Sequence, residues 1–307
     1  MPRKEVAVHN NSKTHSHQHL VRAKSDKNDE YYTPFDAIAQ EMQHYRHSFF
    51  GKTVYCNCDS PSSNFVLYFI LNFYNLGLKR LIVTGIDGHY LDYDGCTTKD
   101  KRINGDFRSQ DCRALLSQCD VVVSNPPFSL FREYFRTLVT AGVDFLVIGP
   151  KTAISYKETF PLLATGRVQL GFTVPDTFIN PEGGKVNLPG LCRWFTSLKS
   201  NTPKPTRLFT VAYDEKIYNH FDLYPAINCD RTEDIPCDFD GLMGVPITAL
   251  EHLDITRYTI VDLIARYAVI DHSYDTPGHQ LTEINGNPKF SRLIIKRKQS
   301  LSLNKAA

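Results

Sequence analysis

Between residues 53 and 150, short apolar segments alternate with segments whose apolar positions recur with a helical period. The apolar segments have the length of buried strands, and helices are expected at 63–77, 113–118 and 130–142. Strands that alternate with helices form right-handed βαβ units, so the pattern predicts an α/β fold with a mostly parallel, doubly wound, Rossmann-like sheet. The expected strands are TVYCNC (53–58), RLIVTGID (80–87), DVVVS (120–124) and VDFLVIGP (143–150).

After about residue 172 the helical period fades, and proline and glycine become frequent. We expect residues 175–240 to form loops and short strands that are added to the sheet domain. Residues 289–298 (KFSRLIIKRK) are expected to form a strand that presents some of its cations on one face. The chain from Ile284 onward contains six Lys or Arg and no acidic residue, so this part either contacts phosphates or is a solvated tail.

Composition narrows the class of protein. The chain has 307 residues, of which 42% are hydrophobic and 22% are charged, which is typical of a globular protein and excludes a disordered chain or a coiled coil. No run of eighteen apolar residues occurs, and the N-terminus lacks the apolar core of a secretory signal, so we expect a soluble cytoplasmic protein. Because the net charge is only +2, any surface for nucleic acid must be a local patch.

The cysteines and histidines do not follow the spacing of a metal site. None of the eight cysteines forms a C-x-x-C pair, and we expect all eight to be reduced and mostly buried. Val54, Cys56 and Cys58 alternate along the first strand, which predicts that both cysteines lie on one face. The tract His15–His19 lies in a polar tail that needs no ligand, so no metal is expected.

The segment with the clearest chemistry is Asn125-Pro126-Pro127-Phe128, which directly follows an expected buried strand. Ligands bind at the carboxyl ends of parallel strands, and two prolines keep the turn stiff. The side-chain oxygen of Asn125 and the carbonyl of Pro126 are able to accept both hydrogens of one NH₂ group, while Phe128 stacks on the ring that carries it. Such a site fits an aromatic amine, above all an extruded nucleobase, whereas the alternative is a rigid turn without chemistry.

The N-P-P-F tetrapeptide after a strand resembles the catalytic motif of the S-adenosylmethionine-dependent amino-methyltransferases, including glutamine and ribosomal-RNA enzymes. Further segments resemble one branch, the EcoRI-type adenine-specific DNA methyltransferases, and in order and spacing they cover about residues 28–297. These segments are NDEYYTP (28–34), VYCNCDSPSSNF (54–65), RWFT (193–196) and DFDGLMGVPIT (238–248).

The resemblance implies roles for residues that precede the catalytic turn. Residues Tyr31, Tyr32, Thr33 and Pro34 match the segment that covers the methionine end of the cofactor. The end of the first strand, with Asn57 and Asp59, stands where such folds normally carry a glycine-rich loop.

This chain has no glycine between Thr53 and Leu76, a departure that the EcoRI branch shares. Asp59 is therefore the candidate for binding the amino group of the cofactor.

Three further residues are assigned to the cofactor. Asp87, at the end of the second strand, either accepts hydrogen bonds from the ribose hydroxyls or is a solvated turn residue. Asp106 and Phe107 match a step of the family in which the carboxylate accepts from the adenine amino group and the ring packs on the adenine. Lys151 and Thr152 either line the pocket or lie at the edge of the core.

The resemblance implies a site-specific enzyme that transfers methyl from S-adenosylmethionine to the exocyclic N6 amine of a flipped adenine in double-stranded DNA. We expect a bacterial or phage role in restriction–modification or DNA protection, with a cognate restriction endonuclease that acts on the same site without direct contact, and a monomeric enzyme. The expected organisation is a flexible tail (1–27), an S-adenosylmethionine-binding catalytic domain (28–174), a less regular target-recognition region that returns to the sheet (175–300), and a second tail (301–307).

Several alternatives stay open at the level of the sequence. In one alternative the methyl acceptor is an RNA adenine or a protein glutamine. In another the protein is a degenerate relative that binds DNA without catalysis. A dehydrogenase is disfavoured, because no G-x-G-x-x-G follows any strand. Trp194 is either a hydrophobic anchor, which we favour, or a residue that stacks near an unpaired base, and the MGVPIT segment is either a connection or a reader of bases.

Overall fold

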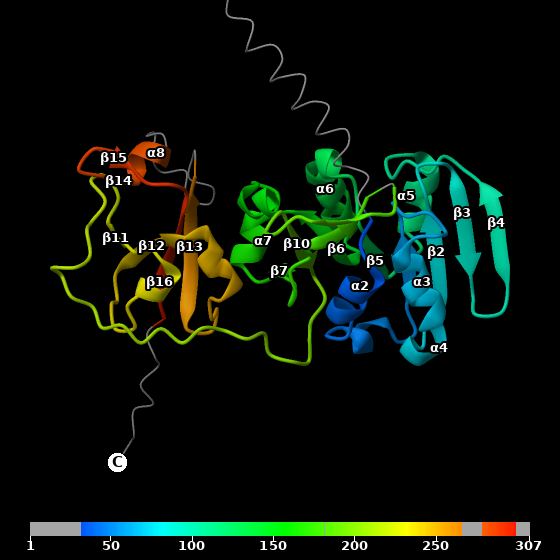
Figure 1. Ribbon diagram of the computed structural model, residues 1–307, viewed down its shortest axis with the longest axis horizontal. Helices are drawn as coiled ribbons and strands as arrows, with labels where there is room; N and C mark the ends of the chain where they lie inside the picture. Colours follow the sequence, from blue (N-terminus) through cyan, green and yellow to red (C-terminus); the bar gives the residue numbers. More distant parts are fainter. Residues whose placement is uncertain (1–31, 181, 266–277, 299–307) are drawn as a thin grey trace, which may run out of the picture.

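The computed structural model describes residues 32–180, 182–265 and 278–298. The predicted tails 1–27 and 301–307, with the histidine tract, lie outside the described residues, and so does Tyr31. Within the described ranges the chain forms a large sheet covered by helices and a smaller second sheet beside it (Figure 1).

Eight strands of the described residues form the large sheet in the order β4-β3-β2-β1-β5-β6-β10-β7. The central strands β2, β1, β5 and β6 run parallel, and antiparallel strands extend the sheet on both sides. This arrangement confirms the predicted Rossmann-like α/β class. The strands are β1 (Thr53–Cys56), β2 (Arg80–Thr84), β3 (His89–Tyr93), β4 (Thr98–Arg102), β5 (Val121–Ser124), β6 (Asp144–Pro150), β7 (Gln169–Leu170) and β10 (Cys192–Thr196).

Helices cover both faces of this sheet, which is why the central residues of its parallel strands are apolar. Val54 and Cys56 pack on the side of α2, α3 and α4, whereas Tyr55 packs on the side of α5, α6 and α7. The helical segments of this part are α2 (Phe35–Met42), η1 (Arg46–Phe49), α3 (Asn64–Leu71), α4 (Phe73–Leu76), α5 (Gln110–Leu116), η2 (Phe128–Leu130), α6 (Phe131–Ala141), η3 (Lys151–Ser155) and α7 (Phe160–Ala164).

Three details differ from the sequence-based expectations. The first strand ends at Cys56, so Cys58 lies in the following turn and packs on the opposite side of the sheet from Cys56. The prediction that both cysteines share one face is therefore wrong, because the regular alternation stops where the strand stops. The helix expected at 63–77 is interrupted at Asn72, although it does end at Gly77, which adopts φ 63°.

The third difference is the segment after β2, which has none of the strands expected from the sequence and forms the β3–β4 hairpin. Strand β4 is exposed along its whole length and alternates lysine with other polar residues. Its residues give no apolar pattern, so backbone pairing with β3, rather than burial, is what makes it a strand.

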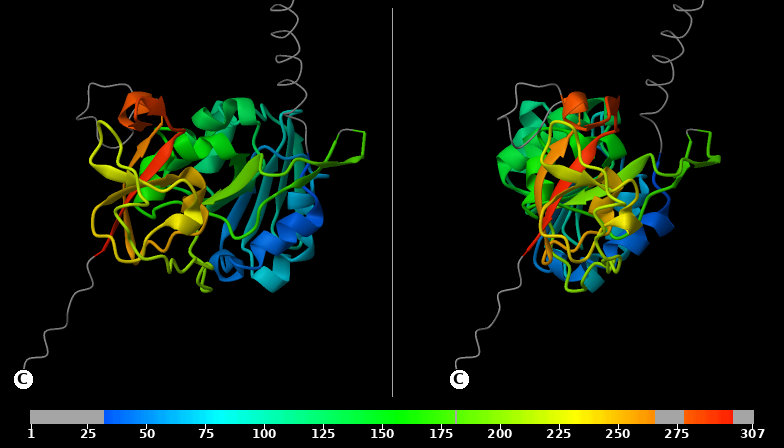
Figure 2. Two further views of the ribbon diagram at one scale, coloured as in Figure 1. Left: turned by 60° about the vertical axis from the view of Figure 1, so that its left-hand side comes forward. Right: turned by 90° about the vertical axis from the view of Figure 1, so that its left-hand side faces the viewer.

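The second half of the chain contributes to both sheets. Strand β10 lies beyond the expected boundary at residue 174 but pairs with β6 over five residues of the large sheet. Before it, a short hairpin projects from the body of the protein (Figure 2) and begins beside the N-terminal segment, because the backbones of Tyr32 and Ile179 pair in both directions at 2.8 Å. Its strands are β8 (Thr177–Ile179) and β9 (Lys185–Asn187).

A four-stranded sheet, in the order β11-β12-β16-β13, forms the C-terminal part of the described chain. Its interior contains Met243 and Val245 of the MGVPIT segment, which favours the structural interpretation of that segment. Strand β16 corresponds to the predicted KFSRLIIKRK strand, but Arg292 points inward and donates to Asn228. The elements are β11 (Ala226–Asn228), η4 (Thr232–Asp234), β12 (Leu242–Pro246), η5 (Ile247–Glu251), β13 (Tyr258–Ile264), α8 (Gly278–Leu281), β14 (Glu283–Ile284), β15 (Asn287–Pro288) and β16 (Arg292–Arg297).

A buried ion pair joins the two sheets. Arg193 of β10 donates from Nε and Nη2 to Oε1 of Glu251 in η5, at 2.9 and 2.7 Å. All eight cysteines are free thiols, and Cys96 is the exposed one. Within the described ranges, no helix is both long and apolar enough to span a membrane.

Candidate active site

The carboxyl ends of β1, β2 and β5 surround a cavity of about 360 Å³. Chain segments far apart in the sequence meet here because the parallel strands all end at the same edge of the sheet. Five of the residues that the sequence assigned to the cofactor or to catalysis line this cavity: Tyr32, Thr33, Asp59, Asp87 and Asn125.

Other lining residues were not assigned from the sequence. Ile86 is 80% exposed, which is costly for a branched apolar side chain and offers a flat ligand a surface to pack on. The sequence could have indicated Ile86, because it stands between a strand end and Asp87. The other unassigned lining residues carry no signal of their own in the sequence. The unassigned residues are Cys58, Ser60, Ser63, Asn64, Phe65, Gly85 and Ile86.

Asp59 carries the buried carboxylate of the cavity, with 7% of the residue exposed. Its Oδ2 accepts a hydrogen bond from the hydroxyl of Ser124 at 2.7 Å, and its backbone N–H donates to the carbonyl of Thr84. Burial raises the pKa of Asp59 to about 6, although hydrogen bonds from Ser124, Ser63 and the backbone of Asn125 partly oppose that shift. A carboxylate held in this way is suited to a cationic ligand group.

Thr33 provides a second polar group at the cavity. Its carbonyl accepts from the side-chain amide of Asn64 at 2.9 Å, which fixes the segment against the start of α3. Its hydroxyl oxygen is buried and finds no hydrogen-bond partner among the described residues, as expected where a ligand supplies one. Pro34 follows as the N-cap residue of α2 and does not line the cavity.

The Asn125–Phe128 turn follows β5 as predicted. Asn125 is half-buried and Pro126 buried, and Pro127 is extended (φ −61°, ψ 126°) before Phe128 opens the short η2 turn that leads into α6. Phe128 is half-buried and packs against the core on the α3 side of the sheet. The turn is therefore rigid at its prolines, while Asn125 reaches the cavity.

Asp87 lies on the rim of the cavity with half of its side chain exposed. Its Oδ1 accepts from the backbone of His89, and Arg102 of the β3–β4 hairpin donates to its backbone carbonyl at 2.8 Å. The hairpin thus supports the loop that carries Asp87. The proposed contact with ribose hydroxyls stays a prediction.

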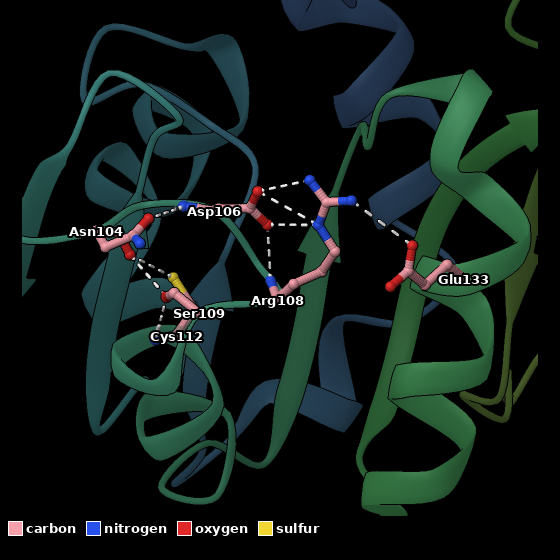
Figure 3. Close-up of polar contacts among 6 residues, drawn as sticks. All are labelled: Asn104, Asp106, Arg108, Ser109, Cys112 and Glu133. Carbon is pink, nitrogen blue, oxygen red and sulfur yellow. Dashed lines mark hydrogen bonds and ion pairs between the residues drawn. The ribbon is translucent and has the colours of Figure 1, made fainter.

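Asp106 lies outside the cavity lining and is bound by an arginine (Figure 3). The guanidinium of Arg108 donates to Oδ1 from Nε at 2.9 Å and to Oδ2 from Nη2 at 2.7 Å, and it extends toward Glu133 at the start of α6. The hydrogen bond from Arg108 lowers the pKa of Asp106. Asp106 is therefore ionised at neutral pH and keeps acceptor capacity beside the loop of Gly85, against which Gly105 packs.

Two predicted cofactor residues point into the protein instead. Asn57 is buried, and its Oδ1 accepts from the hydroxyl of Tyr134 at 2.6 Å. Phe107 is also buried and packs edge-on against the ring of Tyr134 at 5.2 Å between centroids. These contacts attach the loop after β1 and the loop before α5 to α6, and neither residue lines the cavity.

Two further alternatives from the sequence concern Trp194 and Lys151. Trp194 is fully buried in β10 and packs against Phe65 at 6.1 Å, so it is a hydrophobic anchor as favoured. Lys151 begins η3 and does not line the cavity, which agrees with the core-edge alternative.

The central strands of the sheet are parallel, with an antiparallel strand next to the last parallel one. An acidic cavity lies at the carboxyl edge of these strands, and the N-P-P-F turn lies beside that cavity. These features define a Rossmann-like methyltransferase. Comparison with known proteins identifies the branch. The model of the family described as adenine-specific methyltransferase EcoRI matches residues 19–103 and 87–298, and the chain belongs to this family.

Curated relatives extend over almost the whole chain. The chain is 35% identical to the Type II methyltransferase M.EcoRI of Escherichia coli, over 91% of this chain and 96% of that protein. It is 34% identical to the Type II methyltransferases M.MgeORF184P of Mycoplasma genitalium (92% and 99% covered) and M.MpnI of Mycoplasma pneumoniae (91% and 98% covered). The predicted family and enzyme class, an adenine-specific DNA methyltransferase, are thereby confirmed.

Proposed function

We propose that this enzyme transfers a methyl group from S-adenosylmethionine to the N6 amine of an adenine that has been flipped out of duplex DNA. The observation that carries the proposal is the position of Asn125, which begins the N-P-P-F turn and lines the acidic cavity at the same time. One side chain thus lies where a methyl donor in the cavity and an amine at the turn would meet.

The cavity fits S-adenosylmethionine by the chemistry of its lining. Asp59 would hold the ammonium group, and the hydroxyl of Thr33 would bind a polar atom near the methionine end. Asp87 would accept from the ribose hydroxyls, and Ile86 would pack on the adenine. Asp106 would accept from the adenine amino group, and Tyr32 and Pro34 belong to the segment that would cover the methionine end of the cofactor. When bound, the cofactor supplies an electrophilic methyl group on a sulfonium centre.

The turn would activate the acceptor without first removing a proton. The side-chain oxygen of Asn125 and the carbonyl of Pro126 accept the two amine hydrogens, which increases electron density on the nitrogen. Pro127 fixes the turn, and Phe128 stacks on the flipped base. The nitrogen would take up the electrophilic methyl group that the bound cofactor supplies, the cofactor would be left as a thioether, and the extra proton on the nitrogen would leave to water.

Duplex DNA is the proposed substrate, and residues 175–300 are the proposed target-recognition region. The enzyme would act as a monomer, because one active site modifies one strand per visit. We further propose that methylation protects the DNA site from a restriction endonuclease that cuts the same sequence, which is the role expected of a Type II modification enzyme.

The test is methyl transfer from tritiated S-adenosylmethionine to duplex DNA of mixed sequence, followed by nucleoside digestion and mass spectrometry. Label in N6-methyladenine is the expected result. Label in RNA or in protein glutamine, with none in DNA, would contradict the proposed acceptor, and absence of cofactor binding would indicate a degenerate relative. Flipping is tested separately by placing 2-aminopurine at the target position, where its fluorescence rises if the base leaves the stack.

A further inference from the structure

The carboxylate of Asp59 contacts both halves of the active site. It lines the cavity formed by the strand ends, and it is hydrogen-bonded to two consecutive residues of β5 and the turn, the hydroxyl of Ser124 and the backbone N–H of Asn125. Ser124 is completely buried, so its hydroxyl faces protein groups, which are Asp59 and also Cys58 and Tyr134, and not solvent. The residue that directly precedes the catalytic asparagine therefore holds the carboxylate that faces the cavity.

The surroundings of Asp59 contain no cation within the described residues. Burial raises the pKa of its carboxyl. Hydrogen bonds from three neutral donors, Ser124, Ser63 and the backbone N–H of Asn125, lower it. A buried carboxylate without a cationic partner is destabilised in its ionised form, and a cationic ligand in the adjoining cavity removes that penalty. Binding of such a ligand would therefore strengthen the hydrogen bonds that Ser124 and Asn125 make to Asp59.

We propose that Ser124 is a positioning residue that couples the ligand in the cavity to the catalytic turn through Asp59. The inference rests on the proposed function, in which the ligand is S-adenosylmethionine and its ammonium group lies beside Asp59. Ser124 has two effects: it orients the carboxylate toward the ligand, and it makes the position of Asn125 depend on whether that carboxylate is ionised.

The coupling predicts a pH dependence whose sign follows from the geometry. The titratable groups facing Asp59 are Cys56 at the end of β1, Cys58 in the turn that follows and Tyr134 of α6. Burial raises the pKa of each, so all three are neutral near pH 6. Asp59 itself, with a pKa of about 6, is the group that changes charge there. The ammonium group binds the ionised form, so cofactor affinity falls as the pH drops through about 6.

Removal of the Ser124 hydroxyl shifts this midpoint in a defined direction. A hydrogen bond to the ionised carboxylate lowers its pKa, so Ser124→Ala raises the pKa of Asp59 and moves the midpoint of cofactor affinity to higher pH. At pH 7 the affinity for S-adenosylmethionine is expected to fall about 2-fold if the midpoint moves to about 7, and about 10-fold if it moves to about 8. His89, which lies near Asp87 on the rim, is present in every variant and therefore does not contribute to the difference.

The experiment is calorimetric titration of S-adenosylmethionine into the full-length enzyme from pH 5 to pH 8. It compares wild type, Ser124→Ala and Ser124→Cys, which keeps the shape of the side chain but is a weak donor and serves if the alanine variant does not fold. The matched control is Ser197→Ala, which removes a serine–aspartate hydrogen bond of 2.8 Å, to Asp144, at the opposite edge of the same sheet. We expect both Ser124 variants to lose affinity with a raised midpoint, and Ser197→Ala to match wild type.

A Ser124 variant that binds S-adenosylmethionine with the wild-type affinity and the wild-type midpoint would overturn the inference alone. Failure of the wild-type enzyme to bind the cofactor at any pH would overturn the proposed function and this inference with it. A loss of affinity that is equal at every pH would also overturn the coupling, because it is the result of a purely structural role.

Discussion

At the scale of the residue, the active site depends on a few side chains that connect neighbouring strand ends. Asn125 lines the cavity and begins the catalytic turn, whereas Asp106 is held by Arg108 just outside the cavity. In the proposed function these positions separate two tasks, binding the cofactor and activating the acceptor. Substitution of Asn125 should therefore affect mainly the turnover number, and substitution of Asp106 mainly the affinity for the cofactor.

We expect Asn125→Ala to bind S-adenosylmethionine nearly as wild type while its turnover number falls by at least about 100-fold, because the amine loses one of its two acceptors in the transition state. Cofactor binding by calorimetry and methyl transfer under single-turnover conditions measure the two quantities. Turnover like that of wild type would exclude the proposed clamp on the amine.

Asp106→Ala should show the opposite pattern. Loss of the acceptor for the adenine amino group is expected to weaken S-adenosylmethionine binding by about 10-fold, with a smaller effect on turnover at saturating cofactor. Asp100→Ala, which changes an exposed carboxylate of β4, is the control. Unchanged affinity of the Asp106 variant would remove this residue from the cofactor site.

At the scale of the element, two loops must approach closely to build the cavity. The loop before α5 packs on the loop after β2 so tightly that a Cβ atom at Gly105 would overlap the carbonyl oxygen of Gly85. Backbone atoms cannot move aside as a flexible side chain does. This contact is what places Asp106 next to the loop that carries Ile86 and Asp87.

Gly105→Ala is therefore expected to force the two loops apart, to destabilise the protein by about 2 kcal/mol and to weaken S-adenosylmethionine binding. Thermal unfolding and calorimetric titration measure the two effects. Gly184→Ala in the projecting hairpin is the control, because its Cβ would meet only the end of the Asn180 side chain. Equal behaviour of the two variants would show that the loop contact does not matter.

At the scale of the whole molecule, the ion pair of Arg193 and Glu251 is one of the contacts between the two sheets, beside the packing of Phe160 of α7 in the core of the second sheet. Arg193 is 7% exposed and comes from the large sheet, whereas Glu251 comes from η5 next to the second sheet. If the second sheet carries the target-recognition region, this pair helps to set the distance between sequence reading and catalysis.

Glu251→Ala would leave the buried guanidinium of Arg193 without its partner, and we expect the free energy of unfolding to fall by about 3 kcal/mol. Lys52→Ala breaks an exposed ion pair with Asp120 and should change the free energy of unfolding by less than about 1 kcal/mol. Urea denaturation of both variants is the measurement. A Glu251 variant as stable as the Lys52 variant would contradict a role for this pair in joining the sheets.

Some features required no tertiary contact to be predicted. The strands at residues 53, 80, 120 and 143 were expected because both faces of a parallel sheet are buried, so their central residues are apolar. Gly77 and Gly142 end their helices at positive φ as predicted. The N-P-P-F turn was also predictable, since its prolines restrict the backbone whatever surrounds them.

Other features could not be predicted, because they depend on partners distant in the sequence. The exposed strand β4 has no apolar pattern and exists through pairing with β3. Asn57 was assigned to the cofactor from its position at a strand end, but its side chain bonds to Tyr134, 77 residues later.

By itself, the sequence determined the strands of the parallel sheet, the catalytic turn and the family, because each is encoded in residues that are neighbours along the chain. Only the tertiary structure decided which polar side chains share one cavity. Asp59 and Ser124 are 65 residues apart and meet because β1 and β5 are adjacent parallel strands that end at the same edge. Local patterns determine elements, whereas the direction of a side chain is determined by the packing of elements against each other.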